Sequence, residues 1–281
     1  MAGPGDGNTP LLEPPPNHNH VPMDTPQRAS RAHSFNRAAA QYAASRPSYP
    51  PTLLPTVEDL AARPFARSTT VDVGAGTGIS TALLHAHGAH VLAVEPGPGM
   101  AAEFRRAHPH IPLVRADGNA LPVATASVDF LTYAQSWHWT DPTRSVPEAL
   151  RVLRPGGALA LWWNTDALDI PWIADAAGRI RRFLGLDADA PMEQTGTTGA
   201  PAALKVTAGR LDCARRRIRW SRRVSLDTHL ANIASHSGFL VLDEATRNTF
   251  LTEERAHLRA LFPDEEIEET YDVDLLVATR P

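Results

Sequence analysis

A glycine-rich turn at residues 71–80 constrains the fold of this chain more than any other segment. The sequence there reads VDVGAGTGIS, in which a short apolar run leads into three glycines and then into a helical pattern. Gly74, Gly76 and Gly78 allow the backbone to turn sharply and to approach a ligand closely. The following helix presents amino-terminal N–H groups that have no partner inside the helix. The segment therefore predicts a strand, a tight turn and a helix that together form a ligand site.

The residues around this turn discriminate between possible ligands. The dinucleotide-binding pattern G-x-G-x-x-G needs glycine or alanine at position 79, where this chain has Ile79. Asp72, just before the turn, would repel a pyrophosphate, whereas a carboxylate in a partly dry site favours a ligand with positive charge. These features argue against a nicotinamide oxidoreductase and favour a ligand that carries an ammonium or a sulfonium group.

The periodicity of the following residues indicates a doubly wound α/β sheet. Apolar runs typical of buried strands alternate with helical segments, as in parallel sheets whose faces are both covered by helices. The expected strands are TTVDV, HVLAVE, IPLVRAD, SVDFLTYA, ALALWW, RLDCARRRIRWSRRV and, at the end of the chain, YDVDLLVATRP.

Composition divides the chain into three expected regions. Residues 1–30 are rich in Pro, Gly, Asn and His, and we expect a disordered tail there. Residues 31–66 are expected to form an N-terminal helical cap that begins with FNRAAAQYAASR. Residues 67–281 form the expected main domain, with an insert at about 165–206 made of an amphipathic helix and a loop. Insertions at the carboxyl ends of strands often carry ligand contacts, so this insert is expected to contact substrate.

Overall composition suggests a cytoplasmic protein. The chain has 281 residues, of which 43% are hydrophobic, and no apolar run is long enough to span a bilayer. Its single cysteine, Cys213, cannot form an intramolecular disulfide. The net charge of −4 gives no overall attraction to nucleic acid or to an anionic membrane. We expect a monomer or a homodimer.

Charge is distributed unevenly along the second half of the chain. Basic residues are concentrated between Arg179 and Arg223, and acidic residues between Asp243 and Asp274. The two segments could pack together and neutralise each other. Alternatively, arginines such as Arg179, Arg181 and Arg182 could face a cavity for an acidic substrate.

Two further acidic residues follow expected strands. Glu95 ends HVLAVE, where a carboxylate can accept hydrogen bonds from both hydroxyls of a ribose. Asp117 ends the next expected strand, where it can accept from an exocyclic adenine amine, and Gly118 and Asn119 give backbone access. Because the carboxyl ends of parallel strands lie at one edge of a sheet, the acids and the glycine turn are expected to form one nucleoside site.

The segment YAQSWHW at residues 133–139 leaves the fourth strand at the same edge. Trp137 and Trp139 offer π faces that attract cations and shape a pocket, although tryptophans in such positions also pack in cores. His138 titrates near neutral pH, so it could remove a proton from a hydroxyl acceptor or only orient an acceptor that is already a carboxylate. Gln135 is a further candidate for a polar contact.

The order of these motifs, VDVGAGTG, VEPGPGM, RADGNALP, SVDFLTYAQSWHW and LRPGGALALWWN, resembles that of class I S-adenosylmethionine-dependent methyltransferases. The resemblance implies a seven-stranded, mostly parallel sheet whose last strand is antiparallel. It also implies S-adenosylmethionine as the cofactor and no metal. The residues implied at the cofactor are Tyr42, Arg46, Asp72, Gly74, Ala75, Gly76, Gly78, Glu95, Pro96, Met100, Asp117, Gly118, Asn119 and Gln135.

The leader FNRAAAQYAASRPSYP and the QSWHW segment are most similar to the small-molecule branch that includes trans-aconitate-type methyltransferases. We therefore expect methyl transfer to a small-molecule acceptor, at a carboxylate or hydroxyl oxygen, by in-line displacement. The residues expected to act in catalysis are His138, Trp137 and Gln135. Two alternatives stay open: a regulatory protein that holds the cofactor without turnover, and an RNA methyltransferase.

Overall fold

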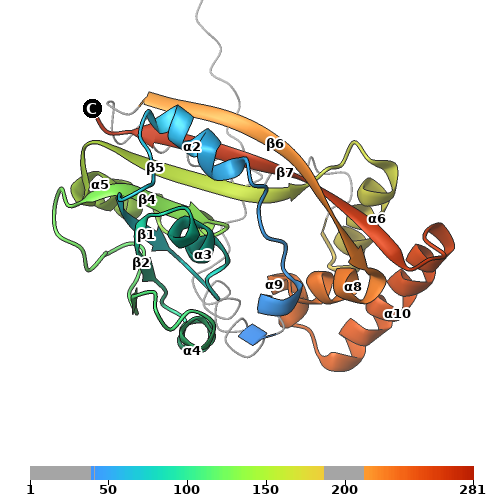
Figure 1. Cartoon of the computed structure of the whole chain (residues 1–281). Helices are drawn as coiled ribbons and strands as arrows, with labels where there is room; N and C mark the ends of the chain where they lie inside the picture. The colour runs from blue at the N-terminus through green and yellow to red at the C-terminus, as the bar shows by residue number, and fades with distance from the viewer. Residues whose placement is uncertain (1–38, 41, 187–211) are drawn as a thin grey trace, which may run out of the picture.

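The computed structural model describes residues 39–40, 42–186 and 212–281, and within them the strands form one sheet in the order β3-β2-β1-β4-β5-β7-β6 (Figure 1). The strands are β1 (Thr69–Val73), β2 (His90–Val94), β3 (Leu113–Val114), β4 (Val128–Ala134), β5 (Leu153–Asp166), β6 (Asp212–Ser225) and β7 (Glu266–Thr279). Neighbouring strands from β3 to β5 pair in parallel, whereas β7 runs antiparallel to both β5 and β6. The predicted fold class, including the antiparallel last strand, is confirmed.

Helices cover both faces of this sheet. On one face α2 (Leu53–Ala61) packs Leu53 and Val57 into a cluster with Trp162 of β5. On the other face α5 (Pro142–Val152) places Val146 among strand residues such as Leu159. The remaining helices of the parallel half are α3 (Ile79–Ala86) and α4 (Pro98–Ala107). The apolar character of the strands thus follows from burial on both sides, as predicted.

The third strand is shorter than predicted. The segment IPLVRAD was expected to be extended throughout, but only Leu113 and Val114 pair with β2. This edge of the sheet has a neighbour on one side only, so few ladder hydrogen bonds favour a longer strand. Asp117 consequently lies in the loop beyond β3, and Glu95, which was expected to end the second strand, comes directly after β2.

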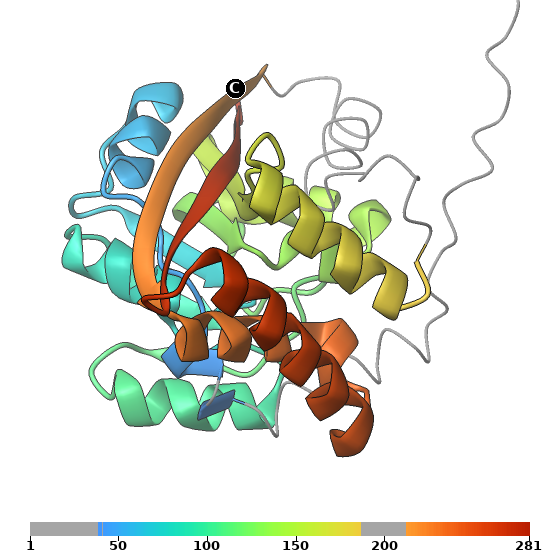
Figure 2. The same cartoon turned by 90° about the vertical axis from the view of Figure 1, so that its right-hand side faces the viewer.

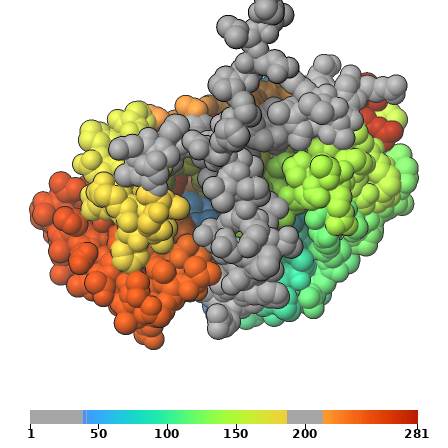
Figure 3. All heavy atoms as spheres, turned by 180° about the vertical axis from the view of Figure 1, so that it is seen from behind, coloured from blue at the N-terminus to red at the C-terminus, as the bar shows by residue number. Residues whose placement is uncertain are grey.

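A group of helices with its own apolar core lies on the side of β6 and β7. It contains α6 (Pro171–Phe183), which is the predicted helix after strand five, and three further helices: α8 (Leu226–Ala234), α9 (Ser237–Leu240) and α10 (Glu244–Leu261). Phe239, Phe250 and Leu258 form their common core. In Figure 2 the orange to red helices α8 and α10 lie beneath the lower ends of β6 and β7, and the yellow helix α6 lies alongside. In Figure 3 most of the yellow to red segments occupy the left-hand side of the molecule.

The uneven charges of the second half pair with each other. Arg219 of β6 contacts both Asp272 of β7 and Asp169, with nitrogen–oxygen distances of 2.9 and 2.7 Å. Arg179 of α6 makes two hydrogen bonds of 2.6 Å to Glu254 of α10. These contacts support mutual neutralisation for these arginines, because an arginine that binds a carboxylate with two nitrogens has less capacity left for an acidic substrate.

Some predictions concern residues that lie outside the described part of the chain. The expected tail at 1–30 and the loop after α6 fall there, while the described residues 39, 40 and 42–45 are helical, in agreement with the predicted leader helix. Among the described residues, no helix combines the length and the apolar character that crossing a bilayer requires. The same residues contain no group of three or more side chains arranged to hold a metal ion.

Candidate functional site

The glycine turn between β1 and α3 has the backbone that the sequence predicts. Gly74, Gly76 and Gly78 have φ angles of +68°, +58° and +97°, a region that strongly favours glycine. Gly78 caps the amino terminus of α3 and packs against His108. A Cβ atom added to Gly76 would meet nothing within 4 Å, so open space borders the turn at this position.

Asp72 lies beneath this turn with only 1% of its surface exposed. Its two carboxylate oxygens accept hydrogen bonds from the hydroxyls of Thr81 and Thr132 at 2.6 and 2.8 Å. Burial raises the pKa of Asp72 to about 6, although these hydroxyls oppose the shift. Asp72 is therefore held in place by its threonine partners and contributes negative potential at the cavity floor.

Glu95 joins the end of β2 to the turn. Its Oε2 accepts from the backbone N–H of Gly76 at 2.8 Å, and its Oε1 accepts from the N–H of Gly97 at 2.7 Å. Each carboxylate oxygen can accept more than one hydrogen bond, so both keep capacity for a ligand. Burial raises the pKa of Glu95, and the two backbone N–H groups oppose that shift.

Asp117 and Asn119 organise the loop after β3. Asp117 Oδ1 accepts from both the backbone and the side-chain nitrogen of Asn119, at 3.0 and 2.9 Å. The side-chain oxygen of Asn119 in turn accepts from the backbone N–H of Asp141, which caps α5. Asn119 thus fixes the loop that presents Asp117.

Two adjacent cavities follow the carboxyl edge of β1, β2 and β4. The larger has a volume of about 170 Å³ and the smaller about 50 Å³. Both are lined by Tyr42, Gly74, Gly76, Ala134 and Gln135, so they form neighbouring parts of one site.

Most of the predicted cofactor residues lie on the walls of these cavities. The larger is lined by Glu95, Pro96, Met100, Asp117 and Gly118, and the smaller by Arg46, Asp72 and Ala75. Gly78 and Asn119 do not line either cavity, and their observed roles are to start α3 and to fix a loop.

One lining residue that sequence reasoning missed is Thr77. Its hydroxyl is buried, and no described group forms a hydrogen bond with Thr77 Oγ1. Thr77 lines the smaller cavity at the amino terminus of α3, where N–H groups at the start of a helix and the helix dipole favour an anion. A hydroxyl directly before a helix and inside a glycine turn is the signal that could have identified it.

The segment that leaves β4 divides its side chains between core and cavity. Trp139 lines the larger cavity together with Ser136 and Thr140. Trp137 is 3% exposed and packs edge-on against Tyr133, with ring centroids 4.7 Å apart. Trp137 therefore occupies the core rather than the cavity wall, which was the alternative that the sequence left open.

His138 has a different position from the one expected of a base at the cavity. It is not among the residues that line either cavity, and its Nδ1 accepts a hydrogen bond of 3.3 Å from the indole N–H of Trp163. A neutral His138 in this arrangement carries its proton on Nε2 and can donate a hydrogen bond there.

Gln135 is the predicted catalytic residue that both cavities share. Its φ of +57° is uncommon for a residue with a side chain, and such backbone strain occurs often at functional sites. Its backbone N–H donates to the carbonyl of Trp162 at 2.9 Å, and its side chain donates to the carbonyl of Asn164 at 3.4 Å.

Comparison with known proteins agrees with this geometry. Residues 71–161 match a family model described as a methyltransferase domain. The chain is 38% identical over 165 residues to an uncharacterized methyltransferase of Mycobacterium tuberculosis, covering 59% of this chain and 64% of that one. It is 37% identical over 107 residues to a demethylmenaquinone methyltransferase of Beutenbergia cavernae, covering 38% and 44%. The chain thus spans less than two thirds of the length of these relatives.

Solved structures share the fold. A protein from Anaeromyxobacter dehalogenans described as a type II methyltransferase has a TM-score of 0.63 and 24% identity, over 83% of this chain and 97% of that one. The [4+2]-cyclase SpnF has a TM-score of 0.52 and 15% identity, over 91% and 96%. Residues 71–161 are thus similar to a methyltransferase domain, and the strand order and the glycine turn with its carboxylates agree with that similarity.

Proposed function

We propose that this protein transfers a methyl group from S-adenosylmethionine to an oxygen atom of a small-molecule acceptor. The observation that carries the proposal is that Glu95, Asp117 and Gln135 line a single cavity beside the glycine turn. Carboxylates there fit a neutral nucleoside with a cationic sulfur better than they fit a pyrophosphate.

The residues of the cavity suggest how the cofactor would be held. Glu95 would accept from the ribose hydroxyls and Asp117 from the adenine amine, with Met100 against the ring. The smaller cavity combines the guanidinium of Arg46 with the unpartnered hydroxyl of Thr77, which suits the carboxylate of the methionine portion. When bound, the cofactor supplies a methyl group activated by its sulfonium.

The proposed acceptor is a carboxylate, as in the trans-aconitate-type branch that the leader and QSWHW resemble. An ionised carboxylate needs no base, and Nδ1 of His138 already accepts from Trp163. Trp139 would exclude water from its side of the cavity, and the ring of His138 lies against it, with ring centroids 4.9 Å apart. Alignment of acceptor, methyl carbon and sulfur can supply up to ~7–11 kcal/mol of barrier reduction without acid–base chemistry.

The two alternatives have different support. A cofactor-binding protein without methyl transfer is compatible with the fold, because a [4+2]-cyclase shares it. An RNA methyltransferase has weaker support, because Arg219 and Arg222 of the basic strand β6 are already bound to acids of β7.

The test combines binding and turnover. Calorimetry with S-adenosylhomocysteine should show a single site, and a screen with S-adenosylmethionine labelled in its methyl group should label a small carboxylic acid from a metabolite extract. Binding without transfer to any fraction would support the regulatory alternative. Labelled RNA whose yield falls steeply with added salt would support the nucleic-acid alternative. Absence of binding would refute the proposal.

A further inference from the structure

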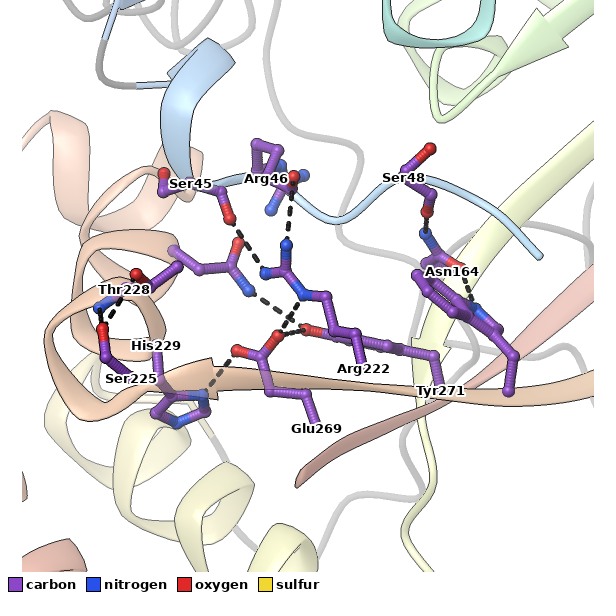
Figure 4. A network of polar contacts seen from close by, with 12 residues as sticks. Ser45, Arg46, Ser48, Asn164, Arg222, Ser225, Thr228, His229, Glu269 and Tyr271 are labelled. Atoms are coloured by element: carbon purple, nitrogen blue, oxygen red, sulfur yellow. Dashed lines mark hydrogen bonds and ion pairs between the residues drawn. The ribbon is translucent and has the colours of Figure 1, made fainter. Parts of the chain in front are cut away.

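The leader segment that covers the smaller cavity is held from outside the site. Arg222 of β6 donates from Nη2 to the carbonyl of Ser45 at 2.9 Å and from Nη1 to the carbonyl of Arg46 at 3.3 Å (Figure 4). A second anchor is Asn164, whose side-chain nitrogen donates to the carbonyl of Ser48 at 2.9 Å. The leader is thereby tied to two strands of the sheet, far from it in sequence.

Arg222 is well placed to fix the end of a helix. Residues 42–45 are helical, and the carbonyls at the carboxyl end of a helix lack partners within it. A guanidinium satisfies these carbonyls with directed N–H groups and places positive charge at the negative end of the helix dipole.

Arg222 is itself held by a buried acid. Its Nε donates to Glu269 Oε2 at 2.6 Å, and Glu269 is only 2% exposed. The hydroxyl of Tyr271 donates to the same oxygen at 2.8 Å, and Nδ1 of His229 lies 2.6 Å from the other (Figure 4). With three partners, the carboxylate of Glu269 has little freedom, so the guanidinium bound to it is fixed as well.

Neither Arg222 nor Glu269 lines the larger or the smaller cavity of the site, but the segment they hold does. Tyr42, Arg46 and Tyr49 all line the smaller cavity above the glycine turn. The guanidinium of Arg46 lies 4.9 Å from the ring centroid of Tyr42, and Tyr49 packs edge-on against Trp162 at 6.1 Å. A shift of the leader backbone would therefore move several walls of the cavity at once.

We propose that Arg222, fixed by Glu269, is a positioning residue that holds the leader over the cofactor site and so determines cofactor affinity without touching the cofactor. The inference rests on the proposed function of that site. If the leader samples several positions when Arg222 is lost, the apparent affinity falls by the fraction of molecules in the binding-competent arrangement.

The chain offers a closely matched control for this proposal. Arg179 and Glu254 also form an arginine–carboxylate pair, with two hydrogen bonds of 2.6 Å where Arg222 and Glu269 share one. Their side-chain exposures of 21% and 1% match the 21% and 2% of Arg222 and Glu269. This control pair joins α6 to α10 and includes no cavity-lining residue. Arg179→Gln should therefore remove a comparable ion pair while leaving the leader in place.

The experiment compares Arg222→Gln and Arg222→Lys with Arg179→Gln. It measures the Kd for S-adenosylhomocysteine, the Tm, and hydrogen exchange of amides in residues 42–49 without ligand. We expect Arg222→Gln to raise the Kd about tenfold and to accelerate exchange in the leader. Arg222→Lys keeps the positive charge but loses the planar guanidinium with its several N–H donors. Its Kd and its leader exchange should therefore lie between those of Arg222→Gln and the wild type. Arg179→Gln should lower the Tm but leave Kd and leader exchange unchanged.

The outcomes separate the two proposals. Equal Kd changes in Arg222→Gln and Arg179→Gln, or leader exchange that does not respond to Arg222, would overturn the positioning role while leaving the cofactor site intact. A wild-type protein that does not bind S-adenosylhomocysteine would instead refute the proposed function, and leader exchange would still test the anchor. If Arg222→Gln does not fold, Glu269→Gln, which loosens the same guanidinium, gives the same comparison.

Discussion

Gly74 and Ser136 approach each other so closely that a Cβ atom on Gly74 would lie 2.5 Å from the Cβ of Ser136. Ser136 cannot easily withdraw, because its hydroxyl donates to the carbonyl of Val73 at 2.5 Å. This contact joins the glycine turn to the segment that leaves β4. Gly74→Ala should therefore destabilise the fold by about 2–4 kcal/mol, from steric overlap together with a strained positive φ. Denaturant unfolding measures the loss.

Gly76→Ala is the matched control for that variant. Its φ is also positive, but an added methyl group would project into open space beside the cavity. We expect a loss of only about 1 kcal/mol from backbone strain, together with much weaker cofactor binding because the methyl group occupies the site. Equal stability losses in the two variants would show that the contact with Ser136 is not tight.

Asp72 should make stability depend on pH in the direction opposite to that of a salt-bridged acid. Burial raises its pKa to about 6 in the folded protein, so the folded state holds a proton that the unfolded chain has already lost. Its contribution is present below the unfolded pKa and is lost as pH rises from about 4 to about 6, for a total near 3 kcal/mol. Asp72→Asn removes this dependence. The difference between the unfolding free energies of the two proteins should change over this range, and parallel curves would contradict the prediction.

Glu95 and Asp117 should each contribute to cofactor binding. Glu95→Gln or Asp117→Ala removes a charged acceptor, which should weaken binding of S-adenosylhomocysteine by about 1.5–3 kcal/mol. Asp117 is exposed but accepts two hydrogen bonds from Asn119, so its variant should lower the Tm only slightly. Glu253→Ala, an exposed acid on α10, is the control for loss of charge. Calorimetry measures the affinity of each variant for S-adenosylhomocysteine. Unchanged affinity in both Glu95→Gln and Asp117→Ala would refute the nucleoside assignment.

His138 lines neither cavity but lies beside Trp139, so it should support the cavity wall rather than remove a proton. His138→Ala should lower turnover of the true acceptor without changing cofactor affinity, and turnover should not fall as His138 becomes protonated. Trp163→Phe removes the indole donor to Nδ1, so nitrogen NMR should show a shift in tautomer away from the Nε2–H form. A turnover rate that falls when His138 gains a proton would instead identify it as a base.

Much of the site could be predicted because its signals are local. The positive φ angles of the turn require glycine, and Ile79 and Asp72 already argued against a pyrophosphate. Glu95 and Asp117 could be placed because strand ends of a parallel sheet meet at one edge, whatever the details of packing. The strand pattern likewise follows from burial of each strand on both faces.

Other features depended on contacts between residues distant in sequence. Trp137 and Trp139 are two positions apart and chemically identical, yet only packing against Tyr133 assigned the first to the core and left the second on the cavity wall. Nothing local indicates that Trp163 would occupy Nδ1 of His138. The sequence by itself determined which residues could bind such a cofactor, because backbone conformation and charge are properties of short segments. Only the tertiary structure decided which side chains reach the cavity and that Arg222 binds the leader segment beside it, because those relationships arise when distant strands become neighbours.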